Sequence, residues 1–209
     1  RNDVDASVIP PDVLAAWIRC RNFGINPHKM PDIKVLQGVE LDDLLERNRT
    51  FIDVSRPFLT NLYQFLKGSR FHVVLIDREG YLLEILGDHD QAELTRAAGG
   101  VVGALWNERS AGYNATGAIV EFKKPVQIFG SEHYIKAYHG ETGYGAPIFS
   151  PQGELLGGIT LNSRNFRVNP HTLGMAVAAA YAIENELKTQ QAFNECQTAY
   201  RYQQTVISS

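Results

Sequence analysis

The sequence predicts an α+β domain in which helices pack on an antiparallel sheet. Two stretches indicate the sheet, residues 70–88 and 142–163, because each joins two β-rich runs through a turn containing Gly with Asp or Pro. Amphipathic helical patterns precede the first stretch and follow the second. Strands joined by tight turns run antiparallel, and helices can then cover the sheet.

Two helical segments are expected before the sheet. The first is a short helix that begins near Pro10 and Pro11, and its apolar face is formed by Val13, Leu14, Trp17 and Ile18. The second is a long amphipathic helix over residues 41–66, which Pro57 is expected to kink or divide. Gly68 follows at a position typical of a helix stop.

The middle of the chain alternates between strands and short helices. The first hairpin turns at residues 77–80, and a short helix over 90–100 ends at Gly99. A strand is expected over 125–130, then a short helix over 131–140 that contains His133 and is capped by Ser131. The second hairpin turns at 151–153, and one long helix then begins with Asn169 as its cap.

The bulk composition indicates a globular chain of one domain with extensions. It has 209 residues, a formal net charge of −3 and two distant cysteines, Cys20 and Cys196. The longest small apolar run, residues 174–183, is about half the length that a membrane span needs. We therefore expect a cytoplasmic chain with no membrane contact and no direct nucleic-acid binding by these residues.

The sequence contains no complete motif for catalysis or for cofactor binding. Residues 109–122, with sequence RSAGYNATGAIVEF, contain two spaced glycines, but neither a phosphate-binding loop nor a dinucleotide fingerprint is present. Ser110, Ser131 and His133 are the nearest candidates for a hydrolytic site, yet no nucleophile motif surrounds either serine. We expect no enzyme activity, no catalytic residue and no cofactor.

Metal binding is the less easily excluded alternative. Two histidines and two glutamates, residues 132, 133, 139 and 141, lie within ten positions of one another. His133 and His139 are six residues apart, however, whereas ligands on one helical face are three or four apart. We expect these side chains to have polar roles and not to bind a metal.

A small-molecule pocket is the most promising site. Four aromatic residues lie beside turn residues, where amphipathic rings can line a cavity: Trp106, Tyr113, Tyr138 and Tyr144. His133 and Asn114 are expected to form hydrogen bonds there, and Glu108 to balance any positive charge on the ligand. The alternatives are that the rings are core, that His133 is a satisfied helix residue, and that Asn114 only caps the helix beginning near residue 115.

Three ordered motifs resemble one family of bacterial enhancer-binding regulators. Residues 15–27, AAWIRCRNFGINP, are similar to its Ser-Trp-x-Arg-Cys…Gly-x-x-Pro entry segment. Residues 106–134 are similar to its Trp-x-Glu…Gly-Thr-Asn-Ala-Ile-Gly segment with the following Pro-Val strand and Glu-His pair. Residues 146–163 resemble its Ala-Ala-Pro-Ile…Gly-x-Leu-x-Gly strand pair. The family contains the acetoin and dihydroxyacetone regulators that activate sigma-54 RNA polymerase, and the matched part is their amino-terminal sensory domain.

The resemblance implies a GAF domain, with helices on one face of a central antiparallel sheet and a ligand cavity on the other. It implies an N-terminal helix and linker over 1–39, the sensory domain over 40–168, and a signalling or dimerisation helix over 169–209. Such regulators continue into PAS and AAA+ domains. Tyr113 and Thr116 depart from the family's threonine and isoleucine, so no relative's ligand can be carried over.

The sequence therefore leaves two alternative functions. The first is a sensory input domain that binds a small, mostly neutral metabolite between the sheet and the segments 102–114 and 133–144. The alternative is a protein-interaction and dimerisation module without a small-molecule ligand. In either case we expect a homodimer in which the last helix, with a stripe of apolar residues from Leu173 to Phe193, shares the interface with the helix after Leu41. Beyond Phe193 the helix is expected to fray without the next domain.

Overall fold

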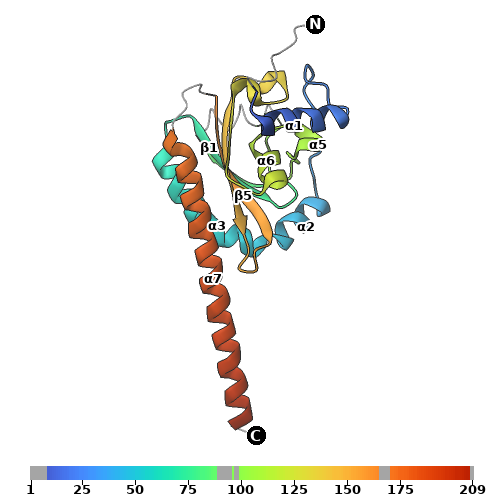
Figure 1. Cartoon of the computed structure of the whole chain (residues 1–209). Coiled ribbons are helices and arrows are strands. Elements are labelled where there is room, and N and C mark those ends of the chain that lie inside the picture. Colours follow the sequence, from blue (N-terminus) through green and yellow to red (C-terminus); the bar gives the residue numbers. More distant parts are fainter. Residues whose placement is uncertain (1–8, 89–95, 97–98, 165–169, 208–209) are drawn as a thin grey trace.

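The structure is a computed structural model that describes residues 9–88, 96, 99–164 and 170–207 (Figure 1). The elements in chain order are α1 (Pro11–Asn22), α2 (Val39–Arg47), α3 (Arg49–Leu66), β1 (Phe71–Asp77), β2 (Leu82–Gly87), α5 (Glu108–Ala111), α6 (Ala115–Phe122), β3 (Val126–Phe129), the 3-10 turns η2 (Gly130–Glu132) and η3 (Lys136–Tyr138), β4 (Thr142–Phe149), β5 (Leu155–Ser163) and α7 (Pro170–Ile207).

The five strands form one antiparallel sheet in the order β2-β1-β5-β4-β3. Both predicted hairpins are present. In the first, Asp77 Oδ1 accepts hydrogen bonds from the backbone amides of Glu79 and Tyr81, and Gly80 takes a positive φ of 94°. In the second, Gly153 takes a φ of 84°. The predicted α+β class with a central antiparallel sheet is confirmed.

The sheet separates two hydrophobic cores. Because side chains alternate along a strand, Val73 and Leu75 of β1 enter one core while Val74 and Ile76 enter the other. Helices α3 and α7 cover the first face, and α1, α5 and α6 lie on the second (Figure 1). The predicted cavity face thus also carries helices.

Glycines bring α6 unusually close to the second face. A Cβ atom on Gly143 of β4 would lie 2.8 Å from the Ala115 Cβ, and one on Gly145 would lie 2.6 Å from Ile119 Cδ1. The alternate positions in β4 carry the large core side chains Tyr144 and Ile148. Large side chains of β4 therefore fill the core under α3 and α7 on one face, whereas glycines on the other face let α6 approach the strand closely.

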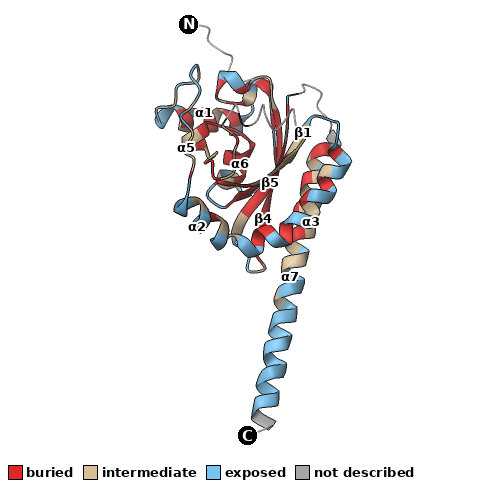
Figure 2. Ribbon diagram, turned by 180° about the vertical axis from the view of Figure 1, so that it is seen from behind, coloured by how far each residue is buried: buried red, intermediate tan, exposed pale blue. Residues whose placement is uncertain are grey.

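Helix α7 has two different halves. Up to about Ile183 its inner face is buried against the sheet and α3, whereas its distal half is exposed (Figure 2). The part expected to fray is helical to Ile207 in the structure. The apolar stripe therefore covers the chain's own sheet over its first half, and Phe193 is 61% exposed.

The helical segment over 41–66 divides at a different residue from the one predicted. The break lies at Asn48, whose side-chain amide donates to the Leu44 carbonyl and ends α2. Pro57 lies inside α3 on its exposed side. The carbonyl that Pro57 leaves without an amide partner therefore faces solvent, where water can replace the missing bond.

The predicted helix over 131–140 is wrong. Two 3-10 turns occupy this segment, His133 between them is extended, and Ser131 caps no helix. The reason is tertiary: the Glu132 carbonyl accepts from Trp17 Nε1 at 2.8 Å, and the Lys136 amide donates to the Pro27 carbonyl. These are the two groups that an α-helix would join to each other.

Two other expectations lie outside the described residues, namely most of the helix over 90–100 and the Asn169 cap. In the parts of the chain that are described, none of the helices combines the length and apolar character needed to cross a bilayer.

Candidate ligand cavity

A cavity of about 60 Å³ lies between the second face of the sheet and the segments on either side of α6 and η3. Its floor comes from the sheet, one wall from residues 106–116 and the other from residues 133–141. The lining residues are His72, Val74, Leu82, Gly100, Trp106, Asn114, Ala115, Thr116, His133, Tyr138, Glu141, Thr160, Asn162, Ser163 and Arg164.

The floor is polar because of strand alternation. His72 shares the face of Val74 on β1, and Thr160 and Asn162 occupy the equivalent face of β5, alternating with the core residues Ile159 and Leu161. The register pairs His72 with Asn162. Asn162 donates through Nδ2 to Thr160 Oγ1 at 2.9 Å, so the floor presents an ordered row of polar groups.

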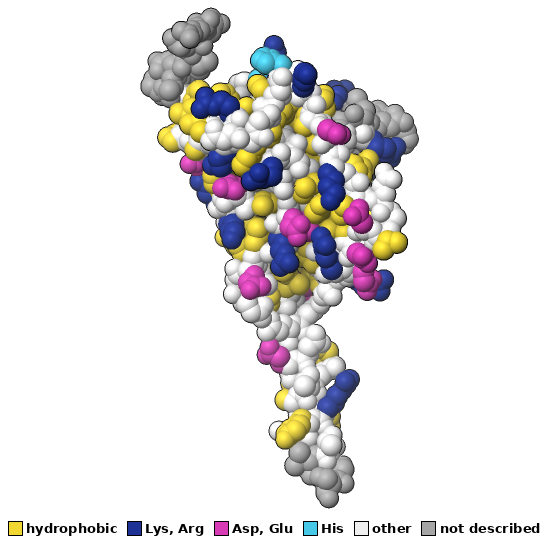
Figure 3. All heavy atoms as spheres, turned by 90° about the vertical axis from the view of Figure 1, so that its right-hand side faces the viewer, with side chains coloured by type: hydrophobic (Ala, Val, Ile, Leu, Met, Phe, Trp, Pro, Cys, Tyr) yellow, Lys and Arg dark blue, Asp and Glu magenta, His cyan; other side chains and the backbone are white. Residues whose placement is uncertain are grey.

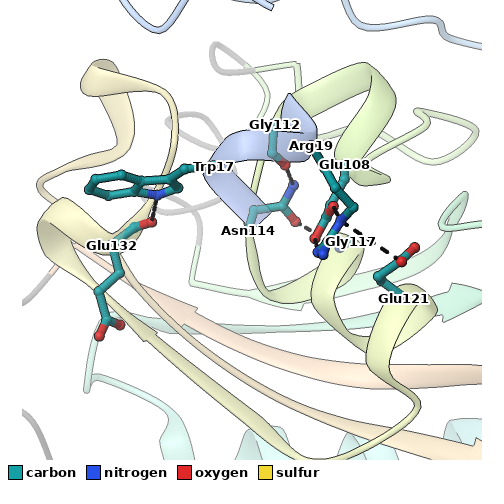
Figure 4. Close-up of polar contacts among 8 residues, drawn as sticks. All are labelled: Trp17, Arg19, Glu108, Gly112, Asn114, Gly117, Glu121 and Glu132. Atoms are coloured by element: carbon teal, nitrogen blue, oxygen red, sulfur yellow. Dashed lines mark hydrogen bonds and ion pairs between the residues drawn. The ribbon is translucent and has the colours of Figure 1, made fainter. Parts of the chain in front are cut away.

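The first wall is fixed by Asn114. Its Oδ1 accepts from the Gly117 amide at 3.1 Å, which caps α6, and its Nδ2 donates to the carbonyls of Trp106 and Gly112. The cap is thus present, and both amide hydrogens are also used within the wall. Figure 4 shows the contacts of Asn114 with Gly112 and Gly117. Asn114 therefore holds the wall's shape while lining the cavity.

The second wall carries the phenol ring of Tyr138 and the imidazole of His133. The Tyr138 ring lies 5.5 Å from the Trp106 ring and 6.5 Å from the His133 ring, measured between centroids. His133 Nδ1 lies 3.0 Å from the Gly130 carbonyl. Because a carbonyl only accepts, Nδ1 carries the proton and Nε2 is the acceptor of the neutral ring.

Three lining residues have a buried side-chain atom without a hydrogen-bond partner among the described residues: His72 Nδ1, Tyr138 Oη and Ser163 Oγ. Ser163 alternates with Asn162 on β5 and shares the strand face of Leu161, so His72 and Tyr138 are the two that belong to the floor and the second wall. Tyr138 is only 2% exposed. A buried polar group without a partner costs free energy, so these atoms favour a bound molecule or water that completes their hydrogen bonds.

Burial keeps the cavity's ionisable rings uncharged. Burial, and to a smaller extent the Arg164 charge, lowers the pKa of His72 to about 4. Burial is also the main reason that the pKa of His133 falls to about 4 and that of Tyr138 rises to about 12. At neutral pH all three side chains therefore offer neutral hydrogen-bonding groups.

The charged residues at the cavity form a pair. Arg164 Nε lies 3.3 Å from Glu141 Oε1, and burial raises the pKa of the Glu141 carboxyl. No group of three His, Cys, Asp or Glu side chains in the described part of the chain is arranged to hold a metal ion.

The structure brings four of the seven expected site residues together at this cavity: Trp106, Asn114, His133 and Tyr138. Tyr113, Tyr144 and Glu108 do not line it. Tyr113 packs edge-on to Phe122 in the second core, and Tyr144 is fully buried in the first core on the opposite face of the sheet. The Glu108 carboxylate forms a two-pronged pair with Arg19 at 2.7 and 2.8 Å, so it is already neutralised.

Sequence reasoning missed the floor. His72, Thr160 and Asn162 were not among the expected residues, although a period-two reading of residues 71–77 and 159–163 places all three on the face opposite Val73, Leu75, Ile159 and Leu161. The same reading places Tyr144 with Ala146 and Ile148, away from the cavity.

A family model for an N-terminal domain and curated bacterial proteins named for transcriptional control both match this chain. The model of the family described as MimR, N-terminal domain, matches residues 2–185. A signal-transduction and transcriptional-control protein of Clostridium beijerinckii is 35% identical over 191 residues, which are 91% of this chain and 30% of that protein. The acetoin dehydrogenase operon transcriptional activator AcoR of Bacillus subtilis is 32% identical over 206 residues, 99% of this chain and 34% of that protein.

The fold has a close match among solved structures. A chain in the E. coli DhaR(N)–DhaL complex superposes with a TM-score of 0.90 at 18% identity, covering 94% of this chain and 67% of that one. The chain spans about a third of the length of the curated relatives it matches.

Proposed function

This chain belongs to the family of MimR N-terminal domains, and we propose that it is the ligand-sensing input domain of a sigma-54-dependent bacterial transcriptional activator. In this proposal residues 40–168 bind a small metabolite, and the flanking segments 1–39 and 169–209 pass the signal to PAS and AAA+ domains of the full-length protein. Relatives that are named as transcriptional activators support the regulatory role.

The observation that carries the proposal is that two residues lining one cavity, His72 through Nδ1 and Tyr138 through Oη, have a buried polar atom with no hydrogen-bond partner in the described part of the chain. Pockets that recognise small molecules combine apolar walls with a few polar groups that fix orientation. Here the first wall supplies Trp106 and the floor supplies Val74 as apolar surface, and the floor and second wall supply the polar groups.

The cavity favours a ligand of few non-hydrogen atoms. A single water needs about 10–15 Å³ of such space, so about 60 Å³ holds a handful of atoms. The ligand should be neutral, because both histidines are uncharged and Arg164 is paired with Glu141. It should carry an oxygen or nitrogen able to bond Tyr138 and His72.

A panel of small neutral alcohols, ketones and amides tests this function through the thermal melting midpoint. A ligand at one hundred times its Kd adds about 3 kcal/mol of stability, which is a measurable shift. The shift should shrink in Tyr138→Phe and persist in Tyr63→Phe, since Tyr63 donates to Asp88 away from the cavity. A panel in which no compound raises the midpoint would contradict the proposal.

A protein-interaction module is the second candidate. Phe65 on α3 and Tyr181 on α7 are 82% and 61% exposed, and large apolar side chains on a surface often mark contact sites. On the face seen in Figure 3, basic and acidic side chains are interspersed. That mixture favours neither candidate, whereas the ligand panel separates them.

A further inference from the structure

The N-terminal helix α1 touches both walls of the cavity, although it lines none of it. Figure 4 shows Arg19 extending toward Glu108 on one side and Trp17 toward Glu132 on the other. The inner face of the helix is firmly seated, because Ala16 and Cys20 are fully buried.

The contact with the first wall is a bidentate ion pair between Arg19 and Glu108. Arg19 Nε and Nη2 donate to the two Glu108 carboxylate oxygens at 2.8 and 2.7 Å. Glu108 is 5% exposed and begins α5, and a Cβ on Gly117 would lie 2.7 Å from its backbone nitrogen. Helix α5 is therefore locked to the first turn of α6, the part that lines the cavity.

The contacts with the second wall are hydrogen bonds to its backbone and one tyrosine. Trp17 Nε1 donates to the Glu132 carbonyl at 2.8 Å, directly before His133. The loop after α1 adds two bonds, from Tyr134 Oη to the Ile25 carbonyl and from the Lys136 amide to the Pro27 carbonyl. These bonds hold the second wall in its non-helical path.

The two walls have few bonds of their own to each other. The Tyr134 amide donates to the Tyr113 carbonyl at 3.2 Å, and the Trp106 and Tyr138 rings are in contact. The N-terminal segment bridges the same two segments from outside through four hydrogen-bonded contacts.

We propose that residues 11–27 are a clamp that holds the two cavity walls together, with Trp17 and Arg19 as its positioning residues. The walls can then separate only if α1 and its following loop lose their hydrogen bonds to one wall. Separation of the walls and release of α1 from the domain are therefore thermodynamically coupled. That a ligand uses this opening rests on the function proposed above. By reciprocity, a ligand enclosed between the walls strengthens α1 docking, and α1 docking strengthens ligand binding.

Hydrogen exchange of the unliganded chain, followed by mass spectrometry, tests the clamp at each wall separately. Trp17→Phe removes one donor at the second wall. Arg19→Met with Glu108→Gln removes the ion pair at the first wall without leaving a buried charge unpaired. Lys124→Gln is the matched control, because Lys124 binds Asp12 of α1 at 2.6 Å on the exposed surface, and its other contact, with the Phe122 ring, also lies outside residues 106–116 and 133–141.

The clamp predicts an effect on the wall that was not altered. Trp17→Phe should accelerate exchange of residues 106–113, and Arg19→Met/Glu108→Gln that of residues 133–140, each by about fivefold, the factor that about 1 kcal/mol of lost hydrogen bonding gives. Lys124→Gln should change both by less than about twofold.

Acceleration confined to the altered wall would overturn the clamp. Equal acceleration in β1 and β5 would overturn it too, since α1 would then support the whole domain. No ligand is present in this experiment, so a failed compound panel leaves its outcome intact, and a failed clamp leaves the ligand proposal standing.

Discussion

At the scale of single residues, the cavity depends on groups that stay neutral although they titrate near neutral pH in water. His133 is 5% exposed and its Nδ1 proton is held by the Gly130 carbonyl. A charged imidazole there would lose its hydration, which is why the pKa falls to about 4 from an ordinary value of 6.5. The neutral ring keeps an acceptor nitrogen available.

This lowered pKa predicts that acid destabilises the fold through His133. Between pH 6.5 and pH 4 the unfolded chain takes up a proton at this residue and the folded chain does not, so stability falls as pH falls through that window. From pH 7 to pH 5 the parent should lose about 2 kcal/mol more unfolding free energy than His133→Gln. Urea unfolding at the two pH values measures the difference, and equal losses would contradict the assignment.

At the scale of elements, the position of α6 depends on glycine in β4. A Cβ on Gly143 would lie 2.8 Å from that of Ala115 and 3.0 Å from Asn162 Oδ1, so α6 must shift to accommodate it. Gly143→Ala should therefore cost about 1–3 kcal/mol, typical of overpacking, and weaken ligand binding by distorting the cavity. Gly140→Ala, where nothing lies within 4 Å, is the control and should be within about 0.5 kcal/mol of the parent. Similar losses in both variants would show that α6 is not held by this contact.

The elements that sequence patterns predicted best are those governed by local turn chemistry. Both hairpins and the long last helix follow from turn residues and periodicity. The segment over 131–140 could not be predicted, because its backbone bonds go to Trp17 and Pro27, more than a hundred residues away. The cavity walls were partly predictable from aromatic residues beside turns, whereas Tyr144 required the alternation of β4 to be followed through.

At the scale of the whole molecule, the exposed half of α7 sets the oligomeric state that we expect. Within the chain, α3 and the first half of α7 pack against each other, so the shared dimer interface expected from the sequence must use their remaining surfaces and the distal half of α7. Phe193, Tyr200 and Tyr202 are each more than 60% exposed there.

Removal of residues 192–209 should therefore convert a dimer to a monomer. The described residues of that segment are exposed, so their removal should not destabilise the folded monomer. The melting midpoint of the shortened chain should therefore equal the midpoint that the parent chain reaches at low concentration, where its dimer dissociates. Sedimentation velocity at high micromolar concentration measures the change. A parent chain that sediments as a monomer, or a shortened chain that still dimerises, would count against this interface.

A high-resolution crystal structure of the chain with its most stabilising panel compound tests directly whether the cavity beside His72 and Tyr138 holds the ligand. We predict density for the compound between the two walls, with a polar atom about 2.7–3.2 Å from Tyr138 Oη and His72 Nδ1. Density for that compound at α3 and α7 instead, with only water in the cavity, would contradict the account.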